Sequence, residues 1–215
     1  FLYYNSLMTI EIKKSKTPVN YTHAINMLEN RVEKIINNNK EKELIWFLEH
    51  SSSFTSGGTH KDNEILDKTI NVIKTSRGGK ITWHGPGQLI CYFVISLKKR
   101  KKDIRKFINS LENSIIETLS EYNIKAYPDR KKVGIWIKVN NQKFKIGAIG
   151  IKVRRWIAYH GFSINITNDL NEYKKIKPCG LNFLKISSLS KFKKQNYNKI
   201  INVLEKKIVK YLKKI

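Results

Sequence analysis

The chain has 215 residues, 40% of them hydrophobic, which is enough for one folded domain with a substantial core. Lys and Arg number 42 against 17 Asp and Glu, so the formal net charge is +25. Such an excess favours acidic partners, whether nucleic acid, anionic membrane or acidic protein, although compositional bias toward Lys, Asn and Ile explains it about equally well. We expect a single domain over residues 1–215.

Membrane insertion and secretion are not expected. The longest clean apolar run is Leu89–Ile95, far short of the roughly 18 residues that a membrane helix needs. The stretch Phe1–Tyr4 has neither a charged leader nor a small-residue cleavage site, so no signal peptide is predicted. The two cysteines show no metal-ligand spacing and are too few to staple a fold of this size, which favours a reduced, cytoplasmic setting.

Hydrophobic periodicity predicts the elements of the first third of the chain. Apolar residues from Tyr21 to Asn37 follow one face of a helix. Leu44–Leu48 is expected to be a buried strand, and Thr69–Thr75 another. Ser51–His60 is rich in Ser, Thr and Gly and is expected to be a loop, and Arg77–Gln88 is the most loop-rich part of the sequence.

The remainder predicts strands followed by helices. Leu89–Leu97 is typical of a buried strand, and Asp103 of the N-cap of a helix. The other expected elements are a hairpin of Val133–Val139 and Lys143–Ile149 around Asn140-Asn141, a strand pair of Trp156–Tyr159 and Phe162–Ile166 interrupted at His160-Gly161, and a C-terminal helix over Asn196–Ile215. This pattern predicts an α+β fold with a mixed, largely antiparallel sheet flanked by helices.

The segment Arg77–Gln88 is a candidate binding site. Four glycines and one proline in twelve residues suit a backbone that approaches a ligand closely. Within it, His84 can serve as a donor or titratable group. The alternative is a turn with a structural histidine, which is the better interpretation of the His84-Gly85 pair alone.

The two cysteines differ in context. Cys179 lies between Pro178 and Gly180, which suits a thiol held at an accessible turn. Cys91 lies inside an apolar strand, where a thiol behaves as a small core residue. Because most cysteines are inert, the turn alone does not distinguish a catalytic Cys179 from a structural one.

Lys145 enters an apolar, glycine-bearing strand instead of a solvated charge run. A partly desolvated lysine loses its proton more readily, and beside a thiol it favours the thiolate. The alternative is an edge lysine whose ammonium reaches water.

Motifs of other chemistries are missing from the sequence. It has no phosphate-binding loop, GxGxxG, GxSxG, HExxH or CxxC motif, and its five histidines show no metal-ligand spacing. These absences argue against nucleotide, serine-hydrolase and metal chemistry, and no cofactor is expected.

Four strings together resemble the octanoyltransferases of lipoate biosynthesis. They are Arg77-Gly78-Gly79-x-x-Thr82-Trp83-His84-Gly85-Pro86-Gly87-Gln88, Lys145-Ile146-Gly147-Ala148-Ile149-Gly150, Tyr159-His160-Gly161-Phe162 and Pro178-Cys179-Gly180. Their order and spacing make the likeness specific, and it runs from about Leu44 to Leu189. Trp83 stands where Tyr or Phe is expected, and Gly147 where Ala is common; neither change removes a reactive group.

The resemblance implies the fold of biotin- and lipoate-protein ligases and an octanoyl transfer from acyl carrier protein to a lysine of a lipoyl domain. It implies Cys179 as the acyl-carrying nucleophile and Lys145 as its proton shuttle. The implied partners are octanoyl-acyl carrier protein, lipoyl domains of 2-oxoacid dehydrogenase complexes and the glycine cleavage H protein, all steered as acidic proteins to a basic surface. The implied substrate tunnel is lined by Arg77, Gly78, Gly79, Lys80, Ile81, Thr82, Trp83, His84, Ala148, Ile149, Gly150, Gly161, Phe162 and Ser163.

Two alternatives remain at this point. An ATP-dependent lipoate- or biotin-protein ligase shares the implied fold but needs no cysteine nucleophile. A basic nucleic-acid-binding protein fits the charge, but the sequence has no RNA-binding aromatic signature or zinc-finger spacing. We therefore expect neither nucleic-acid nor membrane partners.

Overall fold

The computed structural model describes residues 10–37, 41–129 and 132–215. Its strands are β1 (Ile10–Lys14), β2 (Glu43–Leu48), β3 (Ser53–Ser56), β4 (Val72–Lys74), β5 (Ile81–His84), β6 (Gln88–Ser96), β7 (Ala126–Pro128), β8 (Ile135–Val139), β9 (Gln142–Arg154) and β10 (Ile157–Asn165). The α-helices are α1 (Tyr21–Ile36), α2 (Ile104–Glu121), α3 (Leu189–Phe192) and α4 (Ile200–Leu212). Within these ranges, no helix combines the length and the apolar character needed to cross a bilayer. The stretch Phe1–Tyr4 lies outside the described residues.

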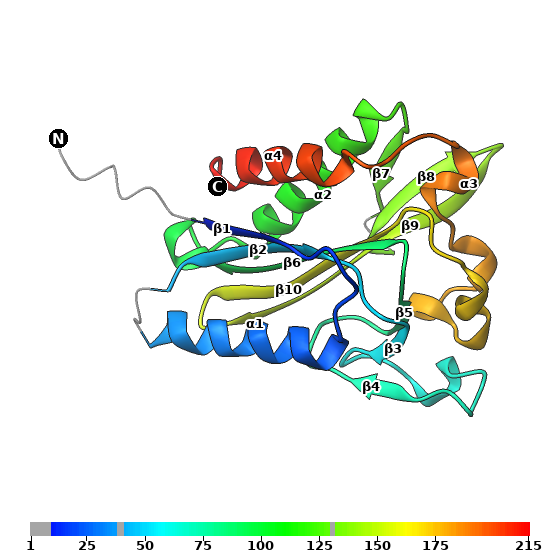
Figure 1. Ribbon diagram of the computed structural model, residues 1–215, viewed down its shortest axis with the longest axis horizontal. Coiled ribbons are helices and arrows are strands. Elements are labelled where there is room, and N and C mark those ends of the chain that lie inside the picture. The colour runs from blue at the N-terminus through cyan, green and yellow to red at the C-terminus, as the bar shows by residue number, and fades with distance from the viewer. Residues whose placement is uncertain (1–9, 38–40, 130–131) are drawn as a thin grey trace.

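Two sheets organise the molecule. The larger has seven strands in the order β1-β2-β6-β10-β9-β8-β7, and all its pairs are antiparallel except β1 with β2. The smaller has the order β4-β3-β5. Helices α2 and α4 lie on one side of the large sheet, and α1 lies on the other (Figure 1). The predicted α+β class with a mixed, largely antiparallel sheet is confirmed.

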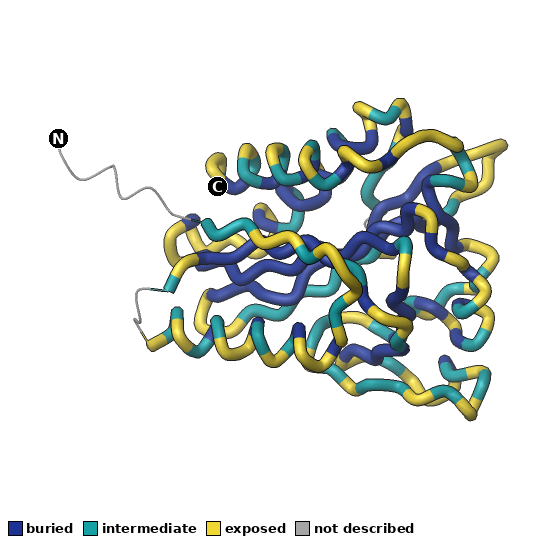
Figure 2. Tube along the Cα trace, in the orientation of Figure 1, coloured by how far each residue is buried: buried dark blue, intermediate teal, exposed yellow. Residues whose placement is uncertain are grey.

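Strand β6 shows why both faces of the large sheet are apolar. Leu89, Cys91 and Phe93 pack in the core under α2 and α4, whereas Ile90 and Tyr92 pack in the core on the α1 side. A strand that is covered on both faces has no solvent-facing positions, so its sequence is a continuous apolar run. The burial along the chain shows the same layering, with buried strands between helices whose outer faces are exposed (Figure 2).

Side-chain caps begin the two long helices. The Asn20 side chain accepts a hydrogen bond from the main-chain N–H of His23 at 3.0 Å, and Asp103 accepts one from Lys106 at 2.8 Å. Each bond satisfies a main-chain donor that has no partner inside its helix. The predicted N-cap at Asp103 is confirmed.

Four predictions about local structure need correction. The expected loops at 51–60 and 77–88 contain β3 and β5, which pair with each other in the small sheet. The expected strand over Thr69–Thr75 shrinks to β4. The strand pair expected to break at His160-Gly161 is one continuous strand, β10, because His160 takes a positive φ of 68° without leaving the ladder. Segments rich in serine, threonine and glycine have a weak local strand signal, so strands that form by pairing with distant parts of the sequence are missed there.

Candidate active site

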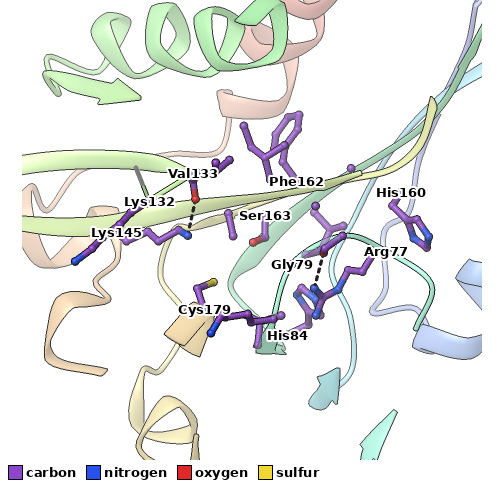
Figure 3. Close-up of a pocket in the computed structure, with 18 of the residues that line it drawn as sticks. Arg77, Gly79, His84, Lys132, Val133, Lys145, His160, Phe162, Ser163 and Cys179 are labelled. Atoms are coloured by element: carbon purple, nitrogen blue, oxygen red, sulfur yellow. Dashed lines mark hydrogen bonds between the residues drawn. The ribbon is translucent and has the colours of Figure 1, made fainter. Parts of the chain in front are cut away.

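A pocket of about 260 Å³ opens between the large sheet and the small sheet. Its walls come from β5, β6, β9 and β10, from the loop at 77–80 and from the turn at 178–181. Cys179 and Lys145 lie at one end of it, and Arg77 and His160 lie at the other (Figure 3). The volume is slightly below the roughly 300–1,000 Å³ of sites for drug-sized ligands, which suits a slender ligand.

Cys179 lies at a tight turn beside the pocket. It belongs to the 3-10 turn Pro178–Gly180, closed by a hydrogen bond from the Gly180 N–H to the Lys177 carbonyl at 3.0 Å. Its backbone has φ 54° and ψ 25°, a left-handed conformation that is uncommon for residues other than glycine. Its side chain is partly exposed and points into the pocket (Figure 3). The turn therefore presents the thiol to a ligand.

Lys145 approaches the same space from β9. The residue is only 6% exposed, and its Nζ donates to the Val133 carbonyl at 2.7 Å. A β-bulge between β8 and β9 leaves Ile146 in the core under α2 and α4 while Lys145 lines the pocket. Bulges re-aim side chains in this way. Lys145 is thus held by a main-chain carbonyl at the end of the pocket that Cys179 also lines, where it can act as a proton-transfer group.

Main-chain contacts join the segment that follows Cys179 to Lys145. Ser187 donates its N–H to the Lys145 carbonyl at 3.0 Å, and Ile186 forms an isolated parallel bridge with Lys145. This connection explains how two residues that lie far apart in sequence meet at one pocket.

The structure brings most of the sequence-predicted residues together. Besides Cys179 and Lys145, the pocket is lined by Arg77, Gly78, Gly79, Lys80, Thr82, His84, Ala148, Ile149, Gly150, Gly161, Phe162 and Ser163. Two predicted lining residues are elsewhere: Ile81 and Trp83 pack in the core of the small sheet because they alternate with Thr82 and His84 along β5. The sequence did not single out six lining residues: Ile90, Tyr92, Lys132, Val133, His160 and Leu181.

Strand alternation offers a signal for two of these six. Ile90 and Tyr92 lie two positions apart on β6 and so share a face. His160 belongs to the string Tyr159-His160-Gly161-Phe162, but no local sequence signal places its side chain at the end of a pocket.

Three buried histidines lie in or beside the pocket. Burial lowers the pKa of His50 to about 4, and burial together with His50 and Arg77 lowers that of His84 to about 3. Burial, Arg77 and Lys152 lower the pKa of His160 to about 3. His84 Nδ1 contacts Gln88 Oε1 at 2.7 Å, and His50 Nε2 contacts the Tyr92 hydroxyl at 2.8 Å. These side chains are neutral hydrogen-bonding groups at neutral pH.

Neutral buried histidines should make the fold sensitive to acid. The unfolded chain binds protons near pH 6.5 that the folded chain does not, so the free energy of unfolding should fall as pH drops from about 6.5 toward 4, by about 1.4 kcal/mol per pH unit for each histidine. Urea unfolding between about pH 7 and 5 measures this slope, and His160→Asn should reduce it by about a third. The exposed His23 is the matched control: His23→Gln should keep the wild-type slope. A pH slope that His160→Asn leaves unchanged would contradict a lowered pKa for His160 in the folded protein.

Cys91 provides the contrast to Cys179. It is fully buried on β6 in the core under α2 and α4, and burial raises the pKa of its thiol well above the ordinary value. A protonated thiol without access to a ligand is a poor nucleophile. The two cysteines of the chain are therefore chemically distinct.

Comparison with known proteins gives a consistent family. The model of the lipoyl protein ligase A/B catalytic domain matches residues 20–209. An octanoyltransferase of Wolbachia sp. subsp. Brugia malayi is 39% identical over 194 residues, which are 89% of this chain and 94% of that protein. An octanoyltransferase of Rickettsia canadensis is 45% identical over 174 residues, covering 79% of this chain and 83% of the relative.

Solved structures show the same fold at low identity. A bipartite lipoate protein ligase from Thermoplasma acidophilum superposes with a TM-score of 0.72 at 16% identity, covering 96% of this chain and 84% of that one. The LipL1 protein of P. falciparum, in complex with lipoate, has a TM-score of 0.69 at 18% identity, covering 96% of this chain and 63% of its own. By its sequence matches and its fold, the chain belongs to the lipoyl protein ligase A/B catalytic domain family, and the two curated relatives described above are octanoyltransferases.

Proposed function

We propose that this enzyme is an octanoyltransferase of protein lipoylation, moving the octanoyl group from acyl carrier protein to a lysine of a lipoyl domain through a thioester on Cys179. The observation that carries the proposal is the placement of Cys179 and Lys145 at one end of the pocket. A family of octanoyltransferases supplies the reaction class. The chemistry below uses only groups that line this pocket.

In the first half-reaction, Cys179 gives its proton to Lys145, and the thiolate attacks the carbonyl carbon of the donor thioester. The new carbon–sulfur bond forms as the bond to the donor sulfur breaks, and the donor thiolate takes the proton from the Lys145 ammonium. One thioester replaces another, so this step has little thermodynamic cost. Splitting the transfer through a covalent intermediate lowers each barrier.

In the second half-reaction, the acceptor amine attacks the acyl group on Cys179. Lys145, now neutral, takes the excess proton from the attacking nitrogen, and Cys179 leaves as a thiolate. The product is an amide, which makes this step downhill. Lys145 is buried and lines the pocket with Cys179, so it is placed to take this proton as a general base.

The lining of the pocket suits a medium-length acyl chain. Ile90, Ile149 and Leu181 offer an apolar lining to the acyl carbons. Burying each methylene contributes about 0.8 kcal/mol, so an octanoyl chain gains roughly 5 kcal/mol from such a pocket. Arg77 and His160 line the opposite end (Figure 3), and they are polar groups that an acyl chain cannot satisfy. Polar groups at this end oppose much longer chains.

The positive charge of the chain fits acidic carrier domains. If charge steers them, raising salt from low to physiological ionic strength should raise the KM for octanoyl-acyl carrier protein several-fold, because screening acts on extended charge. Octanoyl-pantetheine, which lacks the protein surface, is the matched donor and should show little change. Equal salt dependence for both donors would show that the charge is compositional.

The test of the proposed function separates it from an ATP-dependent ligase. Transfer of octanoate to a purified apo-lipoyl domain should proceed with octanoyl-acyl carrier protein and no ATP, and free octanoate with ATP and Mg²⁺ should give no product. Gel-shift or intact mass of the lipoyl domain measures both. Modification that requires ATP and free octanoate would assign the chain to the ligases.

A further inference from the structure

Glu64 is a buried carboxylate behind the pocket wall. It ends the 3-10 helix Asp62–Glu64 and is only 3% exposed. A buried charge is costly unless it is paired and hydrogen-bonded. Its Oε1 accepts from Lys80 Nζ, and its Oε2 accepts from the Lys61 N–H at 3.2 Å. The ion pair with Lys80 therefore connects a buried, hydrogen-bonded carboxylate to a side chain that lines the pocket.

The main chain around Glu64 is bonded to the segment that precedes Cys179. The Glu64 carbonyl accepts from the Lys177 N–H at 2.7 Å. Leu66 and Asp67 both donate to the Lys175 carbonyl, at 2.9 and 3.0 Å. The Ile65–Ile176 bridge lies between these bonds. Glu64 thus fixes the chain two residues before Cys179.

The Lys80 side chain lies against the residue that follows Cys179. A Cβ added at Gly180 would come within 2.9 Å of Lys80 Nζ and 3.1 Å of its Cδ, so the lysine covers the Gly180 backbone. Lys80 also lines the pocket with Cys179 and Lys145. Glu64 therefore contacts the turn Pro178–Gly180 on both sides: its carbonyl binds Lys177 before the turn, and its carboxylate holds Lys80 against Gly180.

The turn requires such support. Cys179 has φ 54°, and Gly180 follows with φ 71°. The backbone of residues other than glycine rarely adopts this left-handed conformation. It persists at functional sites where the surrounding structure holds the backbone in place. A turn that relaxed would move the Cys179 thiol relative to Lys145, whose position is fixed separately by β9 and the Val133 carbonyl.

We propose that Glu64 is a positioning residue: its ion pair with Lys80 clamps the strained turn that presents Cys179 to Lys145, and fixes the Lys80 ammonium at the acyl pocket. The clamp acts in the octanoyl transfer proposed above and rests on that function. It predicts that the carboxylate matters through Lys80, without contacting substrate.

The variants separate the ion pair from the fold. Glu64→Gln keeps the size and an acceptor for Lys61 but removes the charge. The double variant E64Q/K80M removes both charges and leaves no buried ion unpaired. Asp62→Asn is the control on the same 3-10 helix, because the Asp62 side chain is 98% exposed. Circular dichroism and thermal melting establish that each variant is folded.

Two readouts are required, kcat with octanoyl-pantetheine and the rate at which iodoacetamide alkylates Cys179 across pH. We expect kcat and the alkylation rate at neutral pH each to fall about tenfold in Glu64→Gln, as for loss of a fixed conformation. KM should change little, and the double variant should be no slower than Glu64→Gln. Asp62→Asn should match wild type.

Wild-type kcat and alkylation in folded Glu64→Gln would overturn the clamp. So would a further tenfold loss in the double variant, since that result makes Glu64 and Lys80 independent. The alkylation readout does not need acyl transfer. A wild-type protein that transfers no octanoyl group would contradict the proposed function, and the alkylation comparison would still decide the clamp.

Discussion

Replacing Cys179 by Ala should reduce octanoyl transfer by about 10⁴-fold or more, because removal of a covalent nucleophile eliminates the intermediate and leaves only binding and positioning. The fold should survive, since the Cys179 side chain is partly exposed and the turn is closed by main-chain hydrogen bonds. The measurement is kcat/KM for the lipoyl domain with octanoyl-acyl carrier protein as donor.

Cys91→Ala is the matched control. It removes the other thiol of the chain, from the core under α2 and α4, where the change costs stability of about 1 kcal/mol, and Cys91 itself does not line the pocket. Transfer should stay within about twofold of wild type. A Cys91 variant that loses transfer while Cys179→Ala retains it would reverse the assignment of the nucleophile.

Replacing Lys145 by Met should lower kcat by about 10²- to 10⁴-fold, the range associated with loss of a general acid–base group. Methionine keeps an apolar stem in the buried position but cannot hold or deliver a proton. Alkylation of Cys179 at neutral pH should also slow, because the proposed acceptor of the thiol proton is gone and the thiolate is the nucleophile. Raising the pH should restore alkylation but only partly restore transfer. An alkylation profile that superimposes on wild type would show that Lys145 is not the partner.

Gly134→Ala tests the importance of the Lys145 position without replacing the lysine itself. A Cβ added at Gly134 would lie 2.5 Å from Lys145 Cε, and the glycine has a φ of 141°. Gly134→Ala should therefore displace the Lys145 side chain and reproduce much of the loss seen in Lys145→Met. Gly58→Ala is the control, because nothing lies within 4 Å of a Cβ at that position. Equal activity of the two alanine variants would contradict a fixed position for Lys145.

Elements with a strong local signal were predictable from the sequence. The helix periodicity and the cap at Asp103 gave α2, and the paired asparagines Asn140 and Asn141, with φ 46° and 61°, gave the β8–β9 hairpin. The short strands β3 and β5 were not, because their stability comes from pairing with each other and from packing of Phe54 and Trp83 against the segment before Cys179; only β4 of the small sheet lies in a segment expected to be a strand.

The candidate site was predictable as a set of strings but not as a geometry. Cys179 and Lys145 stood out by context and by resemblance, and the structure places both at the pocket. The β-bulge that turns Lys145 away from the core depends on the register of β8 and β9, which a single strand does not encode. The proposed positioning role of Glu64 could not be predicted either, because its partners Lys80 and Lys177 lie far from it in the sequence. Single-domain organisation over 1–215 and a cytoplasmic location stay predictions.

The most direct test is the mass of the protein after brief incubation with octanoyl-acyl carrier protein in the absence of a lipoyl domain. One octanoyl group should be added to the chain, peptide mapping should place it on Cys179, and the adduct should disappear when an apo-lipoyl domain is supplied and becomes octanoylated. Hydroxylamine should also remove it, as expected for a thioester. An adduct on Cys91, or full transfer to the lipoyl domain by a protein that never carries the acyl group, would contradict the mechanism.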